Sequence, residues 1–167
     1  MSAGAVAAAG IAQVPEGRRL FPYMTVKENL LLGAYPGKAW KAKQKRMEWV
    51  MELFPILKER ANMPSRSLSG GEQQMLTIGR GLMAQPQLLM VDEPSLGLAP
   101  VVQDNLYETL GKLRQSKITI LLPEQNALRA LGIADRGYVM QDGRIVLEGN
   151  AASLMQSDLV KKAYLGR

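Results

Sequence analysis

The chain has 167 residues, of which 47% are hydrophobic and 22% charged, a composition typical of a globular chain of one domain or most of one. It contains no cysteine and no histidine, which excludes disulfides, thiol chemistry, histidine-containing triads and most zinc sites, and fits a cytosolic location. The net charge of +6 suits an anionic partner. Aromatic residues make up only 5%, too few for a platform that stacks bases, so we expect no nucleic acid partner.

The first elements predicted are a short strand and a capped helix. Residues 11–16 predict a strand that runs into a loop, because Pro15 opposes a continuing central strand. Thr25 and Glu28 have the spacing of a capping box. A helix is therefore expected to open there and to run to about Tyr35.

A basic, amphipathic helix is expected next, from about Lys38 to Leu57. Its apolar stripe predicts a face that packs in the core. The stripe consists of Trp40, Met47, Val50, Met51 and Phe54.

The segment Leu68–Gln74 predicts a loop that opens another helix. Ser69 precedes Glu72 by three residues, again the spacing of a capping box. Gly70 and Gly71 allow close approach of the backbone to another group. A helix start with free N–H groups and a positive dipole end favours an anion, above all phosphate. This helix is expected to end before Gln85-Pro86.

The apolar run that follows, residues 88–92, predicts a strand that ends in two adjacent carboxylates, Asp92 and Glu93. Open α/β sheets place their ligands at the carboxyl ends of strands. The two carboxylates are therefore candidate site residues.

The rest of the chain continues the alternation of helix and strand. Pro100 is suited to the first position of a helix, and residues 118–122 predict a buried parallel strand. Asp142-Gly143 predicts a hairpin, and Asn126 and Asn150 are expected to cap short helices.

This alternation predicts an α/β fold with a parallel sheet at its core. Residues 25–83 interrupt it as a largely helical subdomain, and residues 84–167 supply an α/β core portion. We expect residues 1–167 to form a single partial domain.

Taken together, Leu68-Ser-Gly-Gly-Glu-Gln-Gln74 and Asp92-Glu-Pro-Ser95 resemble the signature and Walker B motifs of ATP-binding cassette (ABC) proteins, which have a P-loop NTPase-like fold. Further segments resemble the ATP-binding subunits of branched-chain amino acid importers, a pattern shared in large part with urea and short-chain amide importers. These segments are residues 14–22, 25–30, 92–100 and 124–127.

The resemblance implies ATP and Mg²⁺ as ligands. Asp92 matches the aspartate that holds Mg²⁺ through water, as suits a hard cation. Glu93 matches the glutamate that polarises the attacking water. Four residues match the signature loop of the family: Ser69, Gly70, Gly71 and Gln73. In the family this loop contacts the γ-phosphate of an ATP that is bound mainly by a second subunit.

Two further positions match the family with a change of residue type. Glu16 stands where most cassettes have the Q-loop glutamine, and we expect it to serve as a catalytic residue and a metal ligand. Gln125 stands where most have the switch histidine; it can donate to a γ-phosphate oxygen but cannot titrate near neutrality. Pro123 removes a backbone donor beside Gln125.

The 167 residues contain no Gly-x-x-x-x-Gly-Lys-Ser/Thr segment, which is the P-loop. We therefore expect the C-terminal portion of a cassette with its first strands missing. This portion alone is expected neither to bind MgATP tightly nor to hydrolyse it.

Three functions are compatible with these motifs. The first is the ATPase subunit of an importer, peripheral at the cytoplasmic face of the inner or plasma membrane, which pairs with a second ATP-binding subunit and with transmembrane permease subunits. The second is a non-catalytic remnant that supplies only the signature loop to an intact subunit. The third, a DNA-repair or chromosome-organising ATPase, is disfavoured because no sustained heptads are present.

Overall fold

The structure, a computed structural model, describes residues 1–35, 37–113 and 116–164. The chain divides into two compact units, Met1–Pro123 and a second unit that begins at Glu124. Each unit is considered by itself. In the part of the chain that the structure describes, no helix combines the length and the apolar character that a membrane crossing requires.

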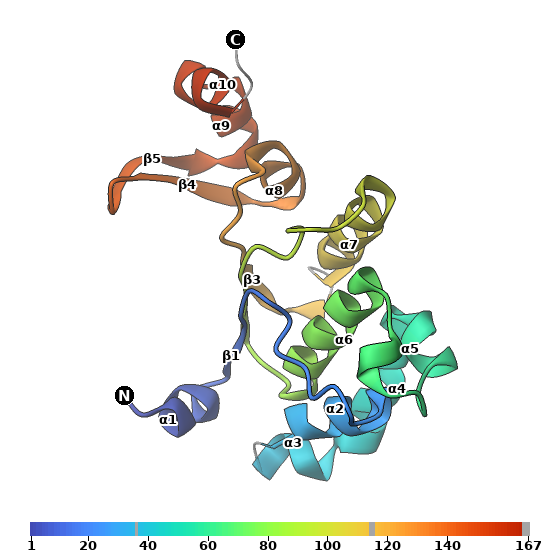
Figure 1. The fold of residues 1–167 in the computed structure, drawn as a ribbon. Coiled ribbons are helices and arrows are strands. Elements are labelled where there is room, and N and C mark those ends of the chain that lie inside the picture. The colour runs from blue at the N-terminus through green and yellow to red at the C-terminus, as the bar shows by residue number, and fades with distance from the viewer. Residues whose placement is uncertain (36, 114–115, 165–167) are drawn as a thin grey trace. The chain divides into compact units, whose positions relative to one another are not determined.

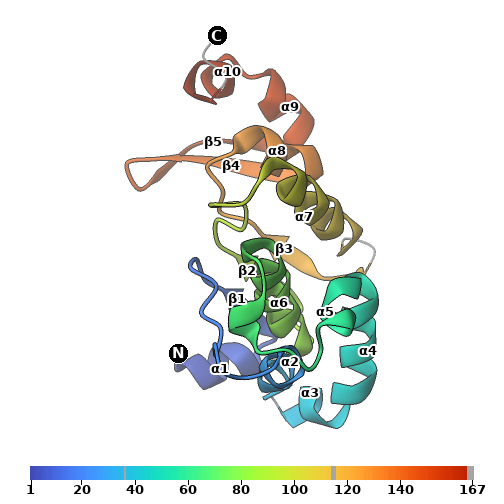
Figure 2. The ribbon, with the colours of Figure 1, turned by 45° about the vertical axis from the view of Figure 1, so that its right-hand side comes forward.

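The first unit (Figure 1) has a three-stranded parallel sheet in the order β1-β2-β3, formed by β1 (Ile11–Val14), β2 (Leu88–Val91) and β3 (Thr119–Leu121). Figure 2 labels all three strands. Ile11 pairs with Leu88 and Val14 with Val91, so β1 and β2 end at the same edge. The parallel α/β sheet confirms the predicted fold class.

β3 differs from the prediction in its burial. It is parallel to β2 as expected, but Thr119 and Leu121 are exposed, Leu121 by 44%. The prediction of a buried strand is wrong because β3 is the last strand of the described sheet and has a pairing partner on one side.

Eight helical segments are seen among the described residues of the first unit. They are α1 (Ala3–Ala8), α2 (Val26–Gly33), α3 (Gly37–Lys41), α4 (Lys43–Leu53), α5 (Pro55–Glu59), η1 (Ser65–Ser67), α6 (Gly70–Met83) and α7 (Pro100–Leu113). The stretch from α2 to α6 contains helices and no strand among its described residues, and its role as a separate subdomain stays a prediction.

The predicted single helix from Lys38 to Leu57 is wrong: three helices, α3, α4 and α5, cover this stretch. Phe54 adopts an extended φ of −126° and ψ of 79° because the ring of Pro55 disfavours helical backbone in the residue before it. Trp40 is 50% exposed, with the Lys43 ammonium 3.5 Å from its ring centroid. The predicted core-facing stripe therefore excludes Trp40 and begins at Met47.

α6 is the central helix of the first unit. It contacts β1 and β2 on one side and α2, α4 and α5 on the other (Figure 2). Arg46 of α4 donates from Nε to the Leu82 carbonyl at the end of α6, 2.9 Å away, and burial lowers the pKa of this guanidinium. The buried face of α6 includes Leu76, Ile78, Leu82 and Met83.

α2 begins as predicted. The Thr25 amide donates to Glu28 Oε2 (2.7 Å), and the Glu28 amide donates to Thr25 Oγ1 (3.1 Å), which completes the capping box. The bonds from the Thr25 amide and hydroxyl lower the pKa of Glu28. Asn29 is fully buried and receives the Phe21 amide at 3.0 Å, so α2 fixes the loop that precedes it.

The second unit contains α8 (Ala127–Ile133), the antiparallel hairpin of β4 (Arg136–Gln141) and β5 (Arg144–Asn150), α9 (Ala151–Gln156) and α10 (Asp158–Tyr164). The hairpin turns at Asp142-Gly143, and Asn126 and Asn150 cap α8 and α9, which confirms these predictions. α10 was not predicted.

Candidate functional site

The helix α6 starts directly after Ser69, as the capping box predicts. The Ser69 amide donates to Glu72 Oε2 at 2.7 Å, and the Glu72 amide donates to Ser69 Oγ at 3.3 Å. The amides of Gly70 and Gly71 lie in the same first turn, where the helix offers no acceptor of its own. This helix end therefore presents N–H groups and a positive dipole end to an anion.

The two glycines of this start have different surroundings. A Cβ at Gly70 would lie 3.2–3.4 Å from the guanidinium of Arg18, whereas a Cβ at Gly71 would lie 2.5 Å from Cγ1 of Val102 in α7. Gly70 therefore has a flexible cation beside it, and Gly71 lies against a rigid side chain of the neighbouring helix.

Two arginines, Arg18 and Arg60, lie near the helix start. The Arg18 guanidinium also lies 4.0 Å from the Cβ position of Gly97, in the loop after β2. Arg60 Nε lies 3.9 Å from Glu72 Oε1, so the carboxylate of the capping box has a cation near it. The sequence contained no signal for these contacts, because the paired residues are far apart in the chain.

Asp92, Glu93 and Glu16 come together at one edge of the sheet. Asp92 and Glu93 directly follow β2, Glu16 follows β1 by one residue, and the two strands end in register. The Asp92 amide donates to the Val14 carbonyl at 3.0 Å, which extends the pairing to the start of the acidic pair. Asp92 and Glu93 thus directly follow a strand end, as the sequence predicts.

The backbone at Glu93 is in the left-handed region, with φ of 41°, which is unfavourable for a residue with a side chain. The Glu93 amide donates to the carbonyl of Pro123 at 3.1 Å. A strained residue of this kind, held by the surrounding structure, is typical of functional sites.

Pro123 causes no visible disruption, because it lies beyond the last residue of β3 and its carbonyl serves as the acceptor for Glu93. Gln125 belongs to the second unit, as its second residue. Its predicted role stays a prediction.

Among the described residues, no three acidic side chains form a cluster able to hold a metal ion alone. Mg²⁺ is usually bound through one or two carboxylates together with phosphates and water. The donor set of Asp92 and Glu16 at one sheet edge fits that mode of binding.

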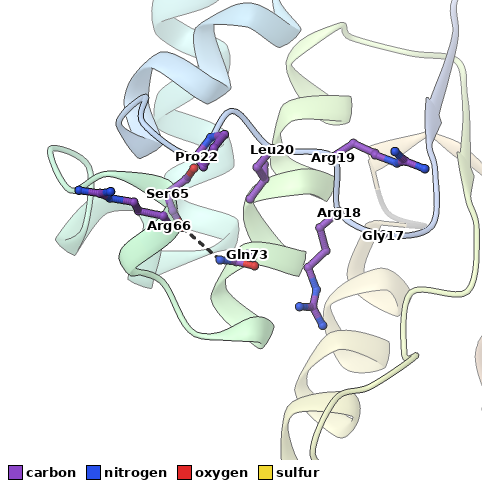
Figure 3. Close-up of a pocket in the computed structure, with 8 residues that line it drawn as sticks. All are labelled: Gly17, Arg18, Arg19, Leu20, Pro22, Ser65, Arg66 and Gln73. Carbon is purple, nitrogen blue, oxygen red and sulfur yellow. Dashed lines mark hydrogen bonds between the residues drawn. The ribbon is translucent and has the colours of Figure 1, made fainter.

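Gln73 lines a hollow of about 260 Å³ between the loop that follows β1 and the segment before α6 (Figure 3). Its side-chain amide donates to the Ser65 carbonyl at 3.3 Å. The arginines of this hollow, Arg18, Arg19 and Arg66, point in different directions in Figure 3. In this arrangement, Gln73 holds the loop before the signature, and its predicted contact with nucleotide stays a prediction.

The turn that follows Glu16 lies on α6. Thr77 Oγ1 donates to the Arg18 carbonyl at 2.9 Å, and an Arg80 guanidinium nitrogen donates to the Arg19 carbonyl at 2.7 Å. Burial lowers the pKa of Arg80, which remains a cation. Neither Thr77 nor Arg80 was a candidate from the sequence, because only the fold brings this turn to the helix.

Comparison with known proteins agrees with this geometry. The pattern of the ABC transporter family matches residues 5–96. The high-affinity branched-chain amino acid transport ATP-binding protein BraG of Pseudomonas aeruginosa is 50% identical over 156 residues, which cover 93% of this chain and 66% of BraG. The probable branched-chain amino acid transport ATP-binding protein LivF of Archaeoglobus fulgidus is 36% identical, with 94% of this chain and 66% of LivF covered.

Among solved structures, a nucleotide-free ATP-binding cassette from an ABC transporter superposes with a TM-score of 0.82 at 26% identity, over 100% of this chain and 73% of that one. The fold and the paired motifs define an ABC nucleotide-binding cassette, and the chain belongs to the ABC transporter family. It spans 66% of the length of BraG and of LivF.

Proposed function

We propose that the chain is part of the ATP-binding and ATP-hydrolysing subunit of an ABC importer that energises the uptake of branched-chain amino acids. The observation that carries this proposal is the 50% identity to BraG over 93% of the chain. A second ATP-binding subunit and transmembrane permease subunits are the proposed partners, and the proposed location is the cytoplasmic face of the membrane.

The residues have distinct proposed roles. The start of α6, with Ser69, Gly70 and Gly71, donates hydrogen bonds to the γ-phosphate of ATP held mainly by the second subunit. The position of Arg18 beside Gly70 adds positive charge to the same helix end. Because the ATP is held mainly by the second subunit, this helix end contacts the γ-phosphate only when the two subunits come together.

The carboxylates at the sheet edge act on the nucleotide in other ways. Asp92 and Glu16 would hold Mg²⁺, which supplies positive charge against the phosphates of ATP when it is bound. Glu93 orients and polarises the attacking water. Gln125 would donate from its amide to a γ-phosphate oxygen.

The 167 residues contain a signature but no P-loop. A test of the proposed function therefore needs the chain joined to a P-loop.

A chimera provides this test. The matched two-thirds of BraG is replaced by this chain, and the product, here termed the BraG chimera, is expressed in P. aeruginosa cells that lack BraG. We expect the chimera to restore uptake of labelled leucine. Glu93→Gln should reduce the ATPase rate of the purified chimera by about 10²–10⁴-fold, because the water loses its base.

The matched control is Glu108→Gln. Glu108 is an exposed glutamate of α7 whose partner is Lys112 at 2.7 Å, and its replacement should leave both uptake and ATPase activity unchanged. A folded chimera that hydrolyses ATP but restores no leucine uptake would contradict the proposed solute. Equal activity of the two variants would contradict the role of Glu93.

A further inference from the structure

Three consecutive residues after Glu16 have left-handed backbone. The φ angles are 81° at Gly17, 62° at Arg18 and 41° at Arg19, and the Arg19 amide donates to the Gly17 carbonyl at 2.7 Å. Glycine adopts this conformation freely, but the two arginines do so at a cost in free energy. Such a turn persists only where neighbouring groups hold it.

The groups that hold this turn belong to the helix that starts with the signature. Thr77 is 2% exposed, and its hydroxyl lies 2.9 Å from the Arg18 carbonyl and 2.8 Å from the Gln73 carbonyl. Arg80, one turn further along α6, donates to the Arg19 carbonyl at 2.7 Å. Both strained arginines therefore have their carbonyls bound to α6.

We propose that Thr77 and Arg80 are positioning residues that hold this turn on α6, so that Glu16 and the signature at Ser69 change position together. Glu16 is joined to the turn directly, and Ser69 caps the helix that holds it. A shift of α6 therefore carries the turn with it as long as these two hydrogen bonds persist. The contact is structural, and its consequence for hydrolysis rests on the proposed function.

Trypsin cleavage after Arg18 and Arg19 in the 167-residue chain, followed by mass spectrometry, measures how often the turn opens. We expect Thr77→Val and Arg80→Gln each to raise cleavage at these two sites by about fivefold, the change in an opening equilibrium expected from one lost hydrogen bond. Thr77→Ser keeps the hydroxyl and should be cleaved at the wild-type rate.

Two matched controls separate this effect from a general loss of stability. Thr109→Val removes a threonine of α7 whose hydroxyl also bonds the carbonyl four residues earlier, that of Asn105, at 2.8 Å. Arg46→Gln removes another arginine that donates to a main-chain carbonyl, that of Leu82. Cleavage after Arg18 and Arg19 should stay at the wild-type rate in both controls.

The proposal is overturned if the Thr77 and Arg80 variants are cleaved at these sites no faster than the controls. It is also overturned if Thr77→Ser is cleaved as fast as Thr77→Val. Because this readout needs no nucleotide, it stands even if the BraG chimera proves inactive.

In an active BraG chimera, Thr77→Val should lower kcat by about fivefold with an unchanged KM for ATP, since no ATP-binding group is altered. A rise in KM alone would contradict a positioning role in the reaction. An inactive parent chimera would instead count against the proposed function, while the cleavage result would still decide whether the turn is held by α6.

Discussion

At Gly71, one methyl group decides whether the start of the signature helix can lie against α7. The Cβ of any other residue would come within 2.5 Å of Cγ1 of Val102 and within 3.6 Å of its Cβ. Such an approach requires the Val102 side chain or one of the two helices to move. Glycine at this position is therefore required by packing inside the chain, in addition to any contact with phosphate.

This requirement predicts a compensating pair. Gly71→Ala should lower the free energy of unfolding by about 1–3 kcal/mol, as overpacking does in well-packed sites. Adding Val102→Ala should recover most of that loss, because it removes the opposing methyl groups. Urea unfolding of the wild type, both single variants and the double variant gives the coupling energy, and purely additive losses would show that Val102 is not the obstacle.

The residues that the sequence identified at this site are those whose roles depend on near neighbours. The Ser69–Glu72 and Thr25–Glu28 capping boxes act across three residues, and both formed as predicted. The contact of Arg18 with the Gly70 position spans more than fifty residues. No local pattern encodes such a contact, so only the fold reveals it.

At the scale of elements, α2 and α6 approach each other closely at Gly33. A Cβ at Gly33 would lie 1.9 Å from the Arg80 carbonyl oxygen and 2.9 Å from Cβ of Met83. Both neighbours are held by α6, so neither can yield without moving the helix. The absence of a side chain at Gly33 therefore allows α2 to pack this closely against the backbone of α6.

Gly33→Ala should therefore reduce the free energy of unfolding by about 3 kcal/mol, at the upper end of the overpacking range. Gly4→Ala is the control in the same unit, since Gly4 is helical and has nothing within 4 Å of its Cβ position. That variant should lose no stability. The denaturant midpoint of each variant measures the difference, and an unchanged midpoint for Gly33→Ala would refute the close packing.

Element boundaries show where sequence patterns were insufficient. The apolar periodicity of residues 38–57 suggested one helix, but Pro55 forces Phe54 out of helical backbone and starts α5 instead. The apolar run at residues 118–122 suggested a buried strand, although burial depends on neighbouring strands rather than on composition. The capped helices and the hairpin at Asp142-Gly143 were predictable because their signals are local.

At the scale of the whole molecule, two separate motifs define the chemistry: a capped helix start at Ser69 and an acidic strand end at Asp92 and Glu93. The α/β class and the order of these motifs followed from the sequence. The convergence of Glu16 with Asp92 required the register of β1 and β2. The left-handed backbone of Glu93, whose amide donates to the Pro123 carbonyl, has no sequence signal.

The central claim is that the helix start at Ser69 binds phosphate, and a negative charge introduced there tests it most directly. Ser69→Asp keeps a good N-cap and a favourable charge for the helix dipole, so α6 should remain stable while phosphate is repelled. Thr25→Asp makes the same change at the other capping box, beside Glu28. The measurement is the ATPase rate of the BraG chimera carrying each substitution.

We expect Ser69→Asp to lower that rate by at least about tenfold, in line with the loss of a donor that stabilises developing charge, and Thr25→Asp to leave it unchanged. Thermal unfolding of the same two proteins confirms that both are folded. A folded Ser69→Asp chimera that hydrolyses ATP at the rate of the Thr25→Asp chimera would contradict the claim that this helix start is the phosphate-binding end.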